Sequence, residues 1–129
     1  MLATSFDDPE QEPPYWVGTN NVVLRTPYPG IFLKAFALVD SPTVEVFVAG
    51  SRRENVRAIE NHLRADEQAL MRELPGGTEI VPDQDWPIRT RETGIEDDDE
   101  RRAWISAVLN TYANALRPRL REWYAASTR

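Results

Sequence analysis

The sequence predicts an α+β protein with a mainly antiparallel sheet and two helices packed on one face of that sheet. Short runs rich in β-branched and aromatic residues come in groups separated by turn signals. Each group is followed by a stretch in which apolar residues recur at helical spacing. The resulting order is three strands, a helix, two strands and a closing helix. A length of 129 residues is also usual for one domain.

The N-terminal segment differs in composition from the rest of the chain. Residues 1–14 are acidic and contain Pro9, Pro13 and Pro14, so we expect a disordered lead before a single domain over residues 15–129. The lead has no basic stretch followed by an apolar run, as a signal peptide would. No part of the chain approaches the roughly 20 apolar residues of a membrane helix. The chain is therefore predicted to be cytoplasmic, with no membrane contact.

The first three strands are predicted over residues 22–26, 31–39 and 43–49. Pro27-Tyr28-Pro29-Gly30 separates the first two, because neither proline can donate to a strand ladder. Asp40-Ser41-Pro42 is a turn signal that joins the second and third into a hairpin. Both faces of this hairpin carry apolar side chains, so we expect it to be central and at least partly covered on both sides.

The first helix is predicted to follow Gly50. Ser51-Arg52-Arg53-Glu54 has the form of a capping box, and Pro75-Gly76-Gly77 is a stop signal. Between them an apolar stripe follows helical spacing, with an interruption at residues 66–67 where we expect the helix to face water. The stripe consists of Val56, Ile59, Leu63, Leu70 and Leu74.

Two short strands and a closing helix complete the chain. The strands are predicted over residues 78–81 and 86–92, with Pro87 restricting the second to an edge or a late start. Asp97 to Glu100 forms a second capping box, and Pro118 predicts a kink or break in the closing helix. The buried stripe of that helix is predicted to be Ile105, Val108, Tyr112, Leu116, Leu120 and Trp123.

The residues that common enzyme sites need are scarce. There is no cysteine, and the one histidine, His62, lies beside the apolar stripe of the first helix, as a boundary residue would. The acids of residues 97–100 point in successive directions about 100° apart on a helix, so capping explains them better than a shared metal ion does. The only lysine, Lys34, lacks the acid two residues earlier that a restriction-type nuclease site needs. We therefore predict no catalytic residue, no cofactor and no metal site.

Arginine supplies the candidate binding residues, since it outnumbers lysine fourteen to one. Arg89 and Arg91 lie two apart on a predicted strand, hence on one face, close to Trp86. Arginine beside an exposed aromatic is the usual equipment for stacking and phosphate contact. Arg117 and Arg119 lie on the closing helix. A genome-wide preference for arginine, with Trp86 in the core, explains the same pattern, and a net charge of −6 disfavours a nucleic-acid partner without excluding one.

The chain from Gly30 onward resembles the bacterial and archaeal domain-of-unknown-function family 4268. The resemblance is carried by the strand Val44-Glu45-Val46-Phe47-Val48, an acid-led helix containing Trp104, and the closing Leu116-Arg117-Pro118-Arg119-Leu120. The sequence departs from the family at residues 65–68, where the family has a lysine-rich helix. Domains of that family stand alone or follow a restriction-endonuclease-like nuclease domain, and they have no assigned catalytic residues.

These observations favour a non-catalytic interaction or accessory domain, and the resemblance implies a setting in bacterial DNA restriction or phage defence. Its candidate surfaces are the arginine-bearing sheet edge and the closing helix. A homodimeric structural or regulatory protein is the first alternative, and a small enzyme using carboxylates is the second. The expected partner is another protein or a second copy of the chain.

Overall fold

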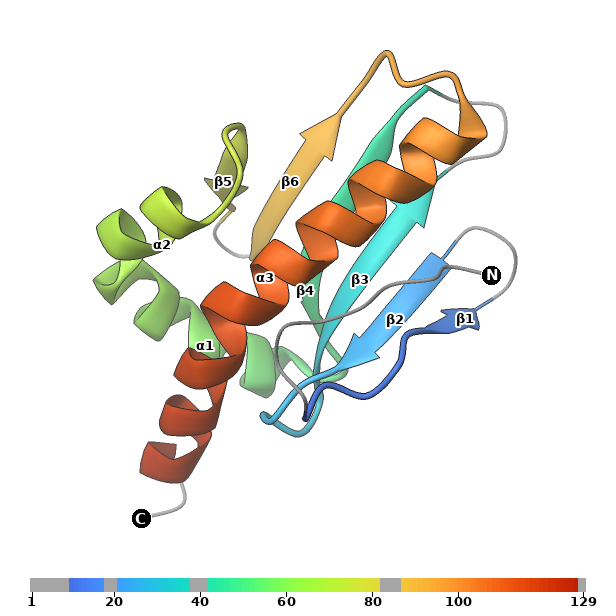
Figure 1. Ribbon diagram of the computed structural model, residues 1–129. Helices are drawn as coiled ribbons and strands as arrows, with labels where there is room; N and C mark the ends of the chain where they lie inside the picture. The colour runs from blue at the N-terminus through green and yellow to red at the C-terminus, as the bar shows by residue number, and fades with distance from the viewer. Residues whose placement is uncertain (1–9, 18–20, 38–41, 82–86, 128–129) are drawn as a thin grey trace.

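The structure is a computed structural model, and it describes residues 10–17, 21–37, 42–81 and 87–127. A six-stranded antiparallel sheet lies against a layer of helices, as Figure 1 shows. The order of the strands across the sheet is β1-β2-β3-β4-β6-β5. This confirms the predicted α+β class with its antiparallel sheet and helices on one face.

The strands match the prediction closely, apart from an added first strand. Hairpin β3–β4 occupies the middle of the sheet, as its apolar composition predicts. The strands are β1 (Tyr15–Val17), β2 (Asn21–Arg25), β3 (Ile31–Ala37), β4 (Val44–Gly50), β5 (Thr78–Ile80) and β6 (Ile88–Glu92). The last strand begins after Pro87, since proline cannot donate to the ladder.

Strand alternation gives the sheet two different faces. On the face toward the helices, the central hairpin contributes fully buried side chains, including Leu33, Ala35, Val46 and Val48. The alternate residues of the same strands, including Phe36 and Phe47, are only partly buried on the opposite side, which we call the open face. The described helices cover one face only, so the expected cover on both sides of the hairpin is found on the face of Leu33 and Val46 and not from helices on the open face.

The helical layer has three members: α1 (Arg53–Ala65), α2 (Glu67–Glu73) and α3 (Asp98–Ser127). The first predicted helix is divided in two at Asp66, the position where its apolar stripe is interrupted. The five residues of that stripe are all buried. Figure 1 shows α3 running diagonally across the sheet, with α1 and α2 packed beside it.

One local prediction about the helices is wrong, and another is right in part. Arg52, and not Ser51, is the N-cap of α1, and no side chain caps it. The backbone N–H of Ser51 instead donates to the carbonyl of Gly30, which continues the β3–β4 ladder one residue further. Helix α3 continues through Pro118 without a break, but Figure 1 shows that its two halves run in different directions, so of the expected kink or break only the break is absent. Pro118 has no N–H to donate to the carbonyl of Asn114. Both residues are exposed, so water can reach that carbonyl.

The start of α3 and its buried stripe follow the prediction. Asp97 caps the helix, because its Oδ2 accepts a hydrogen bond of 3.0 Å from the N–H of Glu100. The predicted stripe from Ile105 to Leu120 is buried, and Trp123 is partly buried against the same core. The Tyr112 hydroxyl lies 2.6 Å from that of Thr90 on β6, which satisfies both polar groups inside the core.

Order begins earlier than the sequence predicts. Residues 1–9 of the expected disordered lead lie outside the described residues, but the side chain of Gln11 is buried. Its amide donates to the carbonyl of Arg25 at 3.2 Å and accepts a hydrogen bond from Arg117. We call residues 10–12 the strap, because they tie the N-terminal segment to β2 and α3. Tethering to a buried arginine is a tertiary effect that composition does not reveal.

Candidate functional site

The open face brings two phenylalanines and two arginines together on three adjacent strands. The strand register defines two rows that cross the sheet. In one row Phe36 of β3 lies opposite Glu45 of β4, which lies opposite Arg91 of β6. The neighbouring row contains Lys34, Phe47, Arg89 and Glu79. Each row therefore combines one phenylalanine with charged side chains of both signs.

The two arginines share a carboxylate. Glu45 lies 3.3 Å from Arg91 and 3.9 Å from Arg89, measured between guanidinium nitrogen and carboxylate oxygen. Arg89 also donates to Glu79 at 2.6 Å, and its side chain is 22% exposed. Arg91 is 55% exposed, which leaves much of its guanidinium in contact with solvent. Arg91 is therefore the more accessible cation of the pair.

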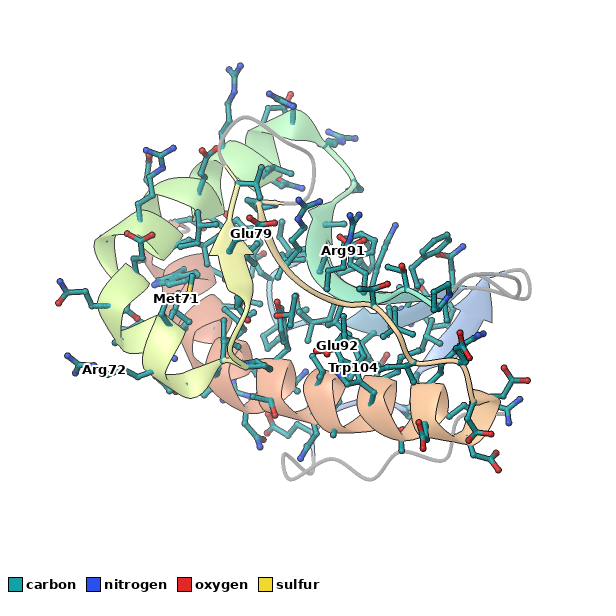
Figure 2. All side chains as sticks on the ribbon, turned by 90° about the horizontal axis from the view of Figure 1, so that it is seen from above. Met71, Arg72, Glu79, Arg91, Glu92 and Trp104 are labelled. Carbon is teal, nitrogen blue, oxygen red and sulfur yellow. The ribbon has the colours of Figure 1, made fainter. Side chains whose placement is uncertain are left out.

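A shallow hollow of about 260 Å³ lies at the centre of this arrangement. Its walls come from both rows, and we call its lining residues the open-face site: Phe36, Glu45, Phe47, Arg89 and Arg91. Figure 2 shows Arg91 and Glu79 on the side of the sheet away from α3. The volume suits one apolar side chain better than an extended substrate.

The structure places the other two candidate arginines elsewhere. Arg117 is 6% exposed, and its guanidinium donates to Oε1 of Gln11 at 2.8 Å. This contact holds the strap against α3. Arg117 thus lies on the helix side of the molecule and does not contribute to the open-face site.

Arg119 joins α3 to the junction between α1 and α2. Its guanidinium is hydrogen-bonded to the carboxylates of Asp66 and Glu73, and it donates to the carbonyl of Ala115 at 2.6 Å. The hydrogen bond from Arg119 holds the pKa of Glu73 below its usual value. The same partnership raises the pKa of Arg119, so the guanidinium stays charged. Arg119 is a clamp between helices.

The sequence analysis also discussed Trp86, His62 and Trp104. Trp86 lies outside the described residues. His62 is exposed and stacks on Trp123, with ring centroids 5.0 Å apart and planes inclined by 12°. Trp104 packs against the core from α3, as Figure 2 shows. His62 therefore contributes to the contact between α1 and α3.

Sequence reasoning missed three of the five open-face residues. Phe36, Phe47 and Glu45 belong to strands that it predicted correctly, but it did not pair those strands residue by residue. The predicted turn at residues 40–42 pairs Val39 with Thr43 and hence Phe36 with Val46, one residue away from the observed pair of Phe36 with Glu45, so it would not have given the register. The order of β4 beside β6 joins segments about forty residues apart, and no local signal in the sequence carries that pairing.

The described residues contain no group of three or more histidine and acidic side chains that could hold a metal ion. The hydroxyl of Tyr112 is unsuited to acid–base exchange near neutral pH, because burial raises its pKa. What the open-face site offers chemically is apolar contact together with charge-assisted hydrogen bonds from arginine.

Comparisons of this chain with protein-family models, with curated proteins and with solved structures found no match. The resemblance to family 4268 therefore stays a prediction. None of the helices in the described ranges is long and apolar enough to cross a membrane.

Proposed function

We propose that this chain is a non-catalytic interaction domain that binds a peptide segment of another protein through the open-face site. The segment would carry an apolar or aromatic side chain next to an acidic one. The observation that carries the proposal is the convergence of Phe36 and Phe47 with Arg89 and Arg91 around one hollow. Aromatic residues and arginine are the types enriched at the centres of protein interfaces.

Charge complementarity supports an acidic segment. Across the two rows there are three cations, Lys34, Arg89 and Arg91, and two carboxylates, Glu45 and Glu79. The rows therefore carry a charge of +1, although the whole chain carries −6. An incoming carboxylate would find its partner in Arg91, the more exposed arginine. A long polyanion would instead meet the repulsion of the whole acidic molecule.

The setting in restriction or phage defence belongs to the same proposal and rests on the resemblance alone. In that setting the bound segment would belong to a nuclease subunit in the bacterial cytoplasm. Gene neighbourhood is the direct check, because an accessory domain is expected beside the gene of its nuclease.

Selection of short random peptides on the immobilised chain tests the proposal. We expect the enriched peptides to combine an aromatic or large aliphatic residue with a neighbouring Asp or Glu. Fluorescence polarisation with one such peptide should show affinity falling about tenfold or more in Phe47→Ala and in Arg91→Ala, as for central interface residues. Circular dichroism would verify that both variants are folded.

Matched controls lie on the helix side. Tyr124→Ala removes an exposed aromatic residue, and Arg57→Ala removes an exposed arginine from α1. Equal losses in the controls and the site variants would refute the proposal. If a single-stranded oligothymidine bound to the chain and its binding required Phe47 and Arg91, the ligand of the open-face site would be a nucleic acid and not a peptide. If sedimentation velocity showed a concentration-dependent dimer that Phe47→Ala dissociates, the partner would be a second copy of this chain.

A further inference from the structure

The strap meets three arginines with three consecutive side chains. Glu10 is 2.8 Å from Arg121, and Glu12 is 3.5 Å from Arg25, between carboxylate oxygen and guanidinium nitrogen. Between them Gln11 accepts a hydrogen bond of 2.8 Å from Arg117. The arginines come from the end of β2 and from α3, so segments far apart in sequence build this cluster.

Except for Gln11, these side chains line an open cavity of about 350 Å³, separate from the open-face site. Its lining contains three arginines and two glutamates, with Thr26 and Pro27 at the β2 end. The lining therefore carries a charge of +1 in a chain of −6. Arg117 is held in place by burial, whereas Arg25 and Arg121 are 65% and 51% exposed and can turn toward a ligand.

We propose that this cavity is a binding site for a phosphate group, and that the carboxylates of Glu10 and Glu12 occupy its arginines when no phosphate is bound. A phosphate carries about the charge of two carboxylates and presents three strong acceptor oxygens on one atom. It can thus meet several guanidinium forks at once, including those of Arg121 and Arg25, which Glu10 and Glu12 meet in the structure.

Exchange of the strap carboxylates for a phosphate leaves the charge of the cavity nearly unchanged. Both glutamate side chains are more than half exposed, so they lose little when they turn into water. The volume exceeds what a phosphate ion alone needs, which gives room for the body of a phosphate monoester. The proposal does not depend on the open-face site.

Calorimetric titration of the whole chain with inorganic phosphate and with ribose 5-phosphate tests the site. We expect both to bind, the monoester more tightly if the source is a phosphorylated small molecule. Arg25→Gln/Arg121→Gln should lower the affinity for phosphate about tenfold or more. Arg57→Gln/Arg72→Gln removes the same charge from exposed positions on α1 and α2 and should leave the affinity within about twofold.

Substitutions in the strap should change the phosphate affinity in the opposite direction. Glu10→Gln/Glu12→Gln removes the competing carboxylates and should raise the phosphate affinity several-fold, whereas a purely structural strap predicts no gain. Thermal melting would confirm that each variant is folded. Absence of phosphate binding, equal losses in the two arginine double variants, or no gain in the glutamine variant would each overturn the proposal. None of these results would alter peptide binding at the open-face site.

Discussion

Two of the Arg-x-Arg pairs in the chain, Arg89–Arg91 on β6 (the strand copy) and Arg117–Arg119 on α3 (the helix copy), behave differently. Side chains two apart on a strand point to the same face, and both guanidiniums on β6 reach Glu45. Side chains two apart on a helix diverge by about 200°. On α3 one arginine therefore meets the strap, and the other clamps the α1–α2 junction. The secondary structure decides whether such a pair forms a surface or two internal ties.

Burial separates the two copies further. Arg117 is almost entirely covered, while more than half of Arg91 faces solvent. A buried hydrogen-bonded charge is costly to disrupt, because truncation leaves its partner without a hydrogen bond in a dry environment. An exposed ion pair contributes little, because water replaces it. The helix copy should therefore affect stability, and the strand copy should affect binding.

The largest effect is expected from Arg117→Ala. The change leaves Oε1 of Gln11 without this donor and opens space under the strap, so unfolding free energy should fall by about 2–3 kcal/mol. Urea denaturation followed by tryptophan fluorescence measures the loss. Arg121→Ala, one turn further along and half exposed, is the control and should cost less than about 1 kcal/mol. Equal losses would mean that burial does not distinguish these arginines.

An intermediate effect with a defined pH dependence is expected at the clamp. The folded-state pKa of Glu73 is lowered by its hydrogen bond from Arg119, so its contribution is present above the unfolded pKa and is lost as pH falls through the folded pKa. Glu73→Gln should therefore lower the melting temperature at neutral pH by the equivalent of about 0.5–1 kcal/mol. Near pH 3 the difference from the parent chain should shrink.

Glu67→Gln on the same helix is the matched control for the clamp. Glu67 is exposed in the first turn of α2, and its substitution should change the melting temperature little at either pH. A Glu73→Gln effect that persists unchanged in acid would show that the carboxylate charge is not its source.

The sequence predicted the fold well because the fold depends on local signals. Strand alternation in β3 and β4 and the apolar stripes from Val56 to Leu74 and from Ile105 to Leu120 all reappear in the structure, while the predicted turn at residues 40–42 lies mostly outside the described residues. The candidate site was predicted only through Arg89 and Arg91. Glu45 and Phe47 joined them through the pairing of β4 with β6, a long-range contact that no periodicity encodes.

Long-range contacts also explain why the sequence did not predict the partners of Arg117, Arg119 and the strap. The helix containing Arg117 and Arg119 was predicted correctly, but an acidic total charge says nothing about which carboxylate meets which arginine. Asp66 interrupts an apolar stripe and was expected to face water. Its side chain is 41% exposed, and it also ends α1 and accepts from Arg119. A polar residue within a stripe can face water and meet a cation at once, and only the tertiary structure reveals the cation.

The smallest effect on stability is expected from Arg91→Ala. Its ion pair with Glu45 is largely exposed on the arginine side, and Glu45 keeps Arg89 as a neighbour, so unfolding free energy should change by less than about 0.5 kcal/mol. The same variant should lose peptide affinity. This combination is what distinguishes a binding arginine from a structural one. If Arg91→Ala destabilised the chain as much as Arg117→Ala, the strand copy would also be an internal tie, and the open-face site would lose its accessible cation.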